Sequence, residues 1–261
     1  MITNIRERKI IYNIEYLTLF VLIVFTFAGI VKGIIGMGLP TISLVVMTLI
    51  LDIETAITMI VIPSFVTNLW QALTGKHLRD LIREFWFFLI LSGLSVYIGT
   101  TLFFNMSNNV STLLLALIII FYSIIVLSGK KISFLNRNLF INKFVIFSSN
   151  GILAGLTGTL IVPGVFYFQS LNFGKEKLLQ ALGIHFSILS LFLGFSKSYY
   201  KTIFDFEMLL LSLTSCISAF IGMFLGRVIL KSINERMFRK IFLFSLLIIG
   251  ILIFLKANIY Y

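Results

Sequence analysis

Two short glycine-rich segments hold the residues of this chain that are best suited to bind a small ligand. One reads Gly29-Ile-Val-Lys-Gly33-Ile-Ile-Gly36, and the other, 122 residues later, reads Gly151-Ile-Leu-Ala-Gly155-Leu-Thr-Gly158. A proline follows each segment, at Pro40 and Pro163. Because glycine and proline disfavour helix, we expect both segments to interrupt helices inside apolar runs. Matched, interrupted helices are the sequence pattern that points to a transporter's binding site.

The chemistry expected at such breaks is anion binding. Backbone groups freed at membrane depth need partners, and a helix that starts after a break directs its positive end at the ligand. The substrate-binding candidates are Gly33, Gly36, Met37, Gly38, Pro40 and Asn68 in the first half, and Gly155, Thr157, Gly158, Thr159 and Pro163 in the second. The alternative is that the small residues only allow close helix packing.

Two ionisable residues inside apolar runs are candidates for tuning charge or relaying protons. Lys32 could supply a fixed positive charge to an anion, or its side chain could reach the membrane interface. His185 titrates near neutral pH and could relay protons, or it could form a hydrogen bond between helices. Helical spacing turns His185 away from the small and polar residues of its own run, such as Gly183 and Ser190.

Asn68 belongs to a polar stripe, Ser64, Thr67, Asn68 and Gln71, on one face of an apolar run. Such a stripe is expected to face protein or water instead of lipid. It is either a cavity wall or a set of interhelical hydrogen bonds, and Pro63 just before it would allow a kink.

The elements that position these residues are expected to be membrane-spanning helices. The 261 residues are 59% hydrophobic and only 12% charged, with a mean hydropathy of +1.07. Apolar runs of about 20 residues, long enough to cross a bilayer as helix, recur along the whole chain. We therefore predict an all-α, polytopic membrane protein with about 8–10 transmembrane segments. The runs cover 16–36, 39–51, 54–73, 84–104, 110–128, 144–158, 159–171, 177–196, 206–226 and 238–256.

The chain divides into two similar halves. We predict a first membrane repeat over residues 1–143, which includes a basic loop at 129–143, and a second over 144–261. The small residues Ser92, Ser95 and Gly99 align with Ala219, Gly222 and Gly226, and each set forms a face that a neighbouring helix can approach closely. Ten crossings would make the repeats inverted, and eight would make them parallel. The positive-inside rule does not separate these two arrangements.

Several other functions are not supported. The net charge of +11 comes from basic residues between apolar runs, which indicates membrane topology and not nucleic-acid binding. The single Cys216 excludes an internal disulfide. No catalytic motif, paired intramembrane carboxylates or nucleotide-binding loop is present, so we expect no enzyme, no metal and no cofactor.

The glycine segments, the prolines, the length and the basic central loop together resemble the sulfite exporter TauE/SafE family. The resemblance implies a secondary transporter in a prokaryotic cytoplasmic membrane, with a small anion such as a sulfur oxyanion or sulfonate as substrate. The lipid bilayer and a coupling ion, H⁺ or Na⁺, would be its other partners. A membrane accessory or assembly protein and a passive anion channel are the alternatives, and the sequence does not give the oligomeric state.

Overall fold

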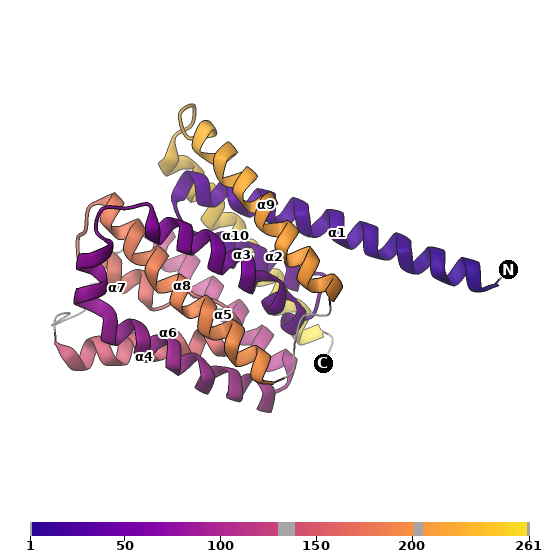
Figure 1. The fold of residues 1–261 in the computed structure, drawn as a ribbon, viewed down its shortest axis with the longest axis horizontal. Helices are drawn as coiled ribbons and strands as arrows, with labels where there is room; N and C mark the ends of the chain where they lie inside the picture. Colours follow the sequence, from indigo (N-terminus) through magenta and orange to yellow (C-terminus); the bar gives the residue numbers. More distant parts are fainter. Residues whose placement is uncertain (1, 130–138, 201–205, 260–261) are drawn as a thin grey trace.

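The fold is an all-helical bundle, seen in a computed structural model that describes residues 2–129, 139–200 and 206–259 (Figure 1). These residues form ten helices and no strand. The helices are α1 (Ile2–Ile35), α2 (Leu39–Thr48), α3 (Ile53–Leu73), α4 (Leu78–Asn105), α5 (Asn108–Leu127), α6 (Phe140–Thr157), α7 (Gly164–Ser170), α8 (Lys175–Tyr199), α9 (Phe206–Ile229) and α10 (Glu235–Ile259). Most of the expected basic loop, at positions 130–138, lies outside the described residues.

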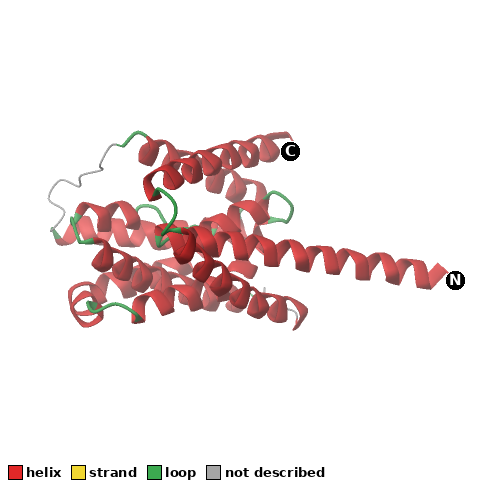
Figure 2. Cartoon of the chain, turned by 90° about the horizontal axis from the view of Figure 1, so that it is seen from above, coloured by secondary structure: helices red, strands yellow, loops and turns green. Residues whose placement is uncertain are grey.

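Seven of these helices are long and apolar enough to cross a membrane, fewer than the 8–10 expected, and they confirm an all-α, polytopic membrane protein. They cover Glu15–Ile35, Ile53–Leu73, Leu78–Asn105, Asn108–Leu127, Lys175–Tyr199, Phe206–Ile229 and Glu235–Asn258. Large apolar side chains cover much of the outer surface, as suits contact with lipid. The N-terminal part of α1 extends beyond the other helices (Figure 2).

The first glycine break turns the chain back on itself. Gly36 and Gly38 have φ of 88° and 109°, left-handed conformations that favour glycine, and they end α1. The short helix α2 then follows α10 in the same direction. Gly38, just before α2, and Arg239, near the start of α10, line one pocket. At the other end, the Lys256 amine of α10 donates to the carbonyls of Thr48 and Leu49, at 3.1 and 2.9 Å.

Small residues bring two pairs of parallel helices into close contact. Gly29 and Gly33 of α1 lie against the backbone of α9 at Ala219 and Met223. Gly151 and Gly155 of α6 lie in the same way against α4, at Ser92 and Val96. Both faces of small residues predicted from the sequence are therefore confirmed as sites of close helix approach.

The antiparallel helices α3 and α8 pack together between these pairs. The Ser64 and Ser190 hydroxyls are 2.8 Å apart, and Gly183 lies against the backbone of Ala72. Pro63 has no N–H to give to the Met59 carbonyl, one helical turn earlier. The Ser212 hydroxyl of α9 donates to that carbonyl instead, at 3.0 Å, so the proline is accommodated by a contact between helices.

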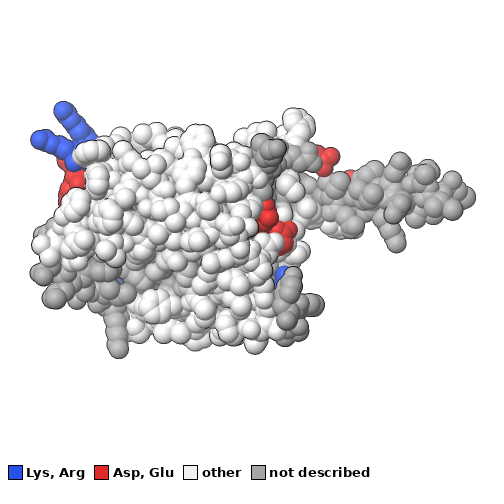
Figure 3. Space-filling view, turned by 90° about the horizontal axis from the view of Figure 1, so that it is seen from below, with Lys and Arg blue, Asp and Glu red and all other residues white. Residues whose placement is uncertain are grey.

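Charged side chains concentrate at the ends of the bundle. Figure 3 shows a largely uncharged side surface, with its most prominent basic side chains at the end away from the N-terminus. The helices α4, α8 and α10 begin with charged first turns, which include Arg79, Lys175 and Glu235. The apolar sides and charged ends are those of a protein that spans a bilayer.

Candidate functional site

A narrow pocket lies at the first glycine break, between α2, α10 and the segment after the second break. Its walls are Ile35, Met37, Gly38, Pro40, Thr41, Tyr122, Ile161, Phe186, Arg239, Phe242, Leu243 and Leu246. Because Ile161 belongs to the second break, the two interrupted segments meet at this pocket. Its cavity volume of about 10 Å³ is roughly the room that one water needs, so the pocket is nearly closed to larger ligands in this conformation.

The start of α2 supplies backbone donors to this pocket. Gly38 is the N-cap and has a left-handed backbone, and no side chain caps the helix. The Ile42 N–H donates to the Gly38 carbonyl at 2.9 Å and forms the first hydrogen bond of α2. The N–H groups of Leu39 and Thr41 lie before this bond, so the helix offers them no acceptor. Pro40 has no N–H to satisfy. This end of α2 therefore combines free donors with the positive end of the helix dipole.

Two side chains complete the polar part of the pocket. The Thr41 hydroxyl is buried, and the described residues offer it no hydrogen-bond partner. Arg239, on the second turn of α10, is half-buried and brings a guanidinium to the same pocket. A hydroxyl, a guanidinium and a helix N-terminus are together suited to hold a small oxyanion.

The second glycine break differs because its backbone groups already have partners. Gly158 is left-handed, with φ of 73°, and ends α6. The Asn150 side chain then accepts from the Gly164 N–H at 2.8 Å and donates to the Leu160 carbonyl at 3.2 Å. The Nε2 of His185 lies 3.0 Å from the same Asn150 oxygen. His185 is thus in a helix contact, on a different side of α8 from the residues that face α3.

The remaining candidates at this second break differ in whether their side-chain hydroxyls have hydrogen-bond partners. The Thr157 hydroxyl donates to the Leu153 carbonyl and accepts from the Thr159 N–H. The Thr159 hydroxyl is buried without a partner among the described residues, as in Thr41. Pro163 immediately precedes α7.

Lys32 lies in a polar cluster apart from the pocket. Its side chain is 2% exposed and donates to Thr67 at 3.2 Å and to Asn68. The Asn68 amide in turn donates to Ser64 at 3.2 Å, and Ser64 contacts Ser190. No carboxylate pairs with Lys32 in the described part of the chain. The polar stripe of α3 therefore forms interhelical hydrogen bonds that connect α1, α3 and α8.

The structure places Gly33 and Gly155 in helix packing and not on the pocket. A Cβ on Gly33 would lie 2.4 Å from the Met223 carbonyl oxygen, and one on Gly155 would lie 2.3 Å from that of Val96. These distances leave no room for a side chain. Of the glycine-segment candidates, Met37, Gly38 and Pro40 line the pocket, and Gly36 lies beside it, against Leu179 of α8.

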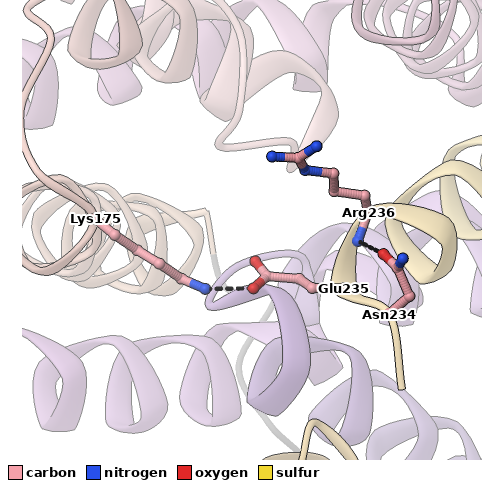
Figure 4. Close-up of polar contacts among 4 residues, drawn as sticks. All are labelled: Lys175, Asn234, Glu235 and Arg236. Atoms are coloured by element: carbon pink, nitrogen blue, oxygen red, sulfur yellow. Dashed lines mark hydrogen bonds and ion pairs between the residues drawn. The ribbon is translucent and has the colours of Figure 1, made fainter.

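An ion pair joins α8 and α10 near the pocket. The Lys175 amine and the Glu235 carboxylate are 2.6 Å apart, and both are partly exposed (Figure 4). Glu235 and Arg239 are one helical turn apart, so they share a face of α10. In Figure 4 the Arg236 side chain points away from this ion pair. The backbone N–H of Arg236 donates to the Asn234 side chain at 3.0 Å.

Sequence reasoning did not single out Thr41, Arg239 or Asn150 as site residues. Arg239 lies at the start of an apolar run, among the basic residues whose positions indicate membrane topology. A signal for Asn150 was available, since it precedes Gly151 inside an apolar run, whereas the aligned residue before Gly29 is Ala28.

Comparisons with known proteins bear on the family. A family model described as sulfite exporter TauE/SafE matches residues 21–253 of the chain. The search of curated proteins and the search of solved structures gave no match.

Proposed function

Because the chain belongs to the sulfite exporter TauE/SafE family of membrane transporters, we propose that it carries a small anion across the cell membrane of a prokaryote by secondary transport. The substrate class that we propose is a sulfur oxyanion, a sulfonate or a related organic anion. Transport would be coupled to an ion gradient, H⁺ or Na⁺, because the sequence contains no nucleotide-binding loop that could drive it.

The observation that carries this proposal is the uncapped start of α2 inside the pocket. Backbone donors, the unpartnered Thr41 hydroxyl and the Arg239 guanidinium converge there from two helices. All three are donors, a set that favours an anion over a cation. The candidate binding residues Gly36, Met37, Gly38 and Pro40 form or adjoin this start.

Lys32 and His185 are proposed to act indirectly. Lys32 lies one turn before Gly36, whose N–H donates to the Lys32 carbonyl at 2.7 Å. A change in the charge of the Lys32 side chain would therefore change the electrostatic potential at the break. His185 positions Asn150, which holds the second break.

We also propose that residues 1–143 and 144–261 are inverted repeats. If the halves are exchanged, α1 corresponds to α6 and α9 corresponds to α4. The parallel pair α1–α9 then corresponds to the parallel pair α6–α4, and the structure contains both pairs. The same exchange replaces α3 by α8, and these helices run antiparallel, as inversion requires. Rocking of inverted repeats around a shared site is a known route to alternating access.

Reconstitution into liposomes tests this function. We expect uptake of ³⁵S-labelled sulfite above that of empty liposomes, accelerated by an imposed proton or sodium gradient. Unlabelled sulfite on the far side should exchange with the label, as expected of a carrier. Flux that is unaffected by either gradient and shows no exchange would indicate a channel, and no flux for a panel of sulfur oxyanions and sulfonates would refute the proposal.

A further inference from the structure

The start of α4 carries three cations around an open groove at the charged end of the bundle. Lys76, Arg79 and Arg83 line this groove together with Leu78 and Ile82, and its volume is about 640 Å³. The cations are three and four residues apart, so they share one side of the helix and the turn before it. The groove is distinct from the pocket at α2, with which it shares no residue.

The three cations have no anionic partner among the residues that the structure describes. Within the described ranges the ion pair found is Lys175–Glu235, and no carboxylate lies within 4 Å of Lys76, Arg79 or Arg83. The sequence offers Asp80 and Glu84 next to them, but their side chains do not pair with the cations. The start of α4 adds the positive end of a helix dipole to the same place.

An exposed apolar stripe continues from this groove along α4. It consists of Ile82, Trp86, Ile90, Leu94 and Ile98, which are 43 to 56% exposed and recur every four residues. Trp86 lies one turn beyond the cations, where a tryptophan is expected to meet the headgroup level of a bilayer. The cations, the tryptophan and the apolar stripe thus follow one another along an oblique ridge of the helix, because residues four apart advance about 40° around its axis at each step.

We propose that this side of α4 binds an anionic phospholipid. Its phosphate would contact Lys76, Arg79 and Arg83, and an acyl chain would lie along the apolar stripe. The lipid phosphate would supply the counter-charge that the described carboxylates do not. The same donors could hold free phosphate, but only a lipid also covers the exposed stripe.

The test measures lipid binding to the full chain purified in detergent. Phosphatidylglycerol should raise the unfolding temperature and remain bound in native mass spectra, whereas phosphatidylcholine should do neither. The triple change K76Q/R79Q/R83Q should weaken phosphatidylglycerol binding about 100-fold, because each of the three surface cations contributes roughly a fivefold factor. Arg79→Gln alone should give a smaller loss in the same direction. These side chains are exposed and unpaired, so the variants should fold.

A matched control separates this site from a general charge effect. The triple change K231Q/R236Q/K240Q removes the same charge at the same end of the bundle but leaves the groove intact. An equal loss of binding in both triple variants would overturn the proposal. Stabilisation by inorganic phosphate as strong as that by phosphatidylglycerol would overturn it in favour of a free-phosphate site.

Discussion

Replacing Arg239 by glutamine tests the role of the pocket in anion binding. Arg239 is the cationic side chain of the pocket lining, and it shares the pocket with Thr41 and the start of α2. Glutamine keeps a polar side chain but loses the charge and most of the donors. The change should therefore affect anion affinity far more than folding, since Arg239 is half-buried at the end of a helix and forms no ion pair with the described residues.

The size of the effect follows from the environment of the guanidinium. A hydrogen bond to a charged group contributes about 1.5–3 kcal/mol, and partial exposure favours the lower part of this range. About 1.5–2 kcal/mol corresponds to a rise in Kd of roughly 10- to 30-fold. If Arg239 lay only near the ligand, without contact, salt would screen most of its effect.

The assay is equilibrium binding of ³⁵S-labelled sulfite or sulfonate to the purified protein, at physiological ionic strength. Arg236→Gln is the matched control, because it removes the same charge one turn away on α10 while Arg236 does not line the pocket. We expect the control to change Kd by less than about twofold, given screening over the intervening distance. Equal effects of the two variants, or an unchanged Kd in R239Q, would refute the assignment of the pocket as the anion site.

Three further variants test other parts of the structure. Thr41→Val should raise the Kd for the anion about fivefold, because it removes roughly 1 kcal/mol of hydrogen bonding. Thr41→Ser keeps the hydroxyl and should not raise the Kd, so similar binding in both variants would contradict a role for the hydroxyl. Gly155→Leu should lower the unfolding temperature, at a cost of about 1–3 kcal/mol or more, because its Cβ would lie 2.3 Å from the Val96 oxygen. Gly174→Leu is the control, since nothing lies within 4 Å of a Cβ there, and equal losses would argue against tight packing at Gly155. Lys32→Met should lower the unfolding temperature, because it leaves the Asn68 side-chain oxygen and the Thr67 hydroxyl buried without their donor; an unchanged or raised unfolding temperature would show that burying an amine without a carboxylate costs more than these hydrogen bonds contribute.

The helices could be predicted from the sequence because the bilayer fixes their length and polarity. The expected run 84–104 corresponds to α4, which begins earlier, at Leu78. The difference arises because the first turns of α4 contain Arg79, Asp80 and Arg83, and a hydropathy pattern stops at such charges. The faces of small residues were also predictable from their spacing. Their partners were not, because Gly33 contacts Met223 from the other half of the chain.

The candidate site could be predicted only in part. The glycine segments located the first break, and Met37, Gly38 and Pro40 line the pocket as that pattern suggests. Arg239 is about 200 residues away in sequence, and nothing in its neighbourhood separates a pocket residue from one that sets topology. Its position depends on the packing of α10 along α2, which is a long-range contact.

The difference between the two breaks explains why a repeated sequence pattern leads to one proposed site. In the second half, the side chain of Asn150 satisfies the Gly164 N–H and the Leu160 carbonyl. The aligned residue of the first half is Ala28, whose methyl group cannot form either bond. The aligned backbone groups of the first half, the Ile42 N–H and the Gly38 carbonyl, bond to each other at 2.9 Å instead and begin α2. The Leu39 and Thr41 N–H groups then lie before this first helical bond, at the pocket that Arg239 also lines. Because buried donors without partners are costly, an anion bound at the first break, as proposed, would recover free energy there by accepting from these donors.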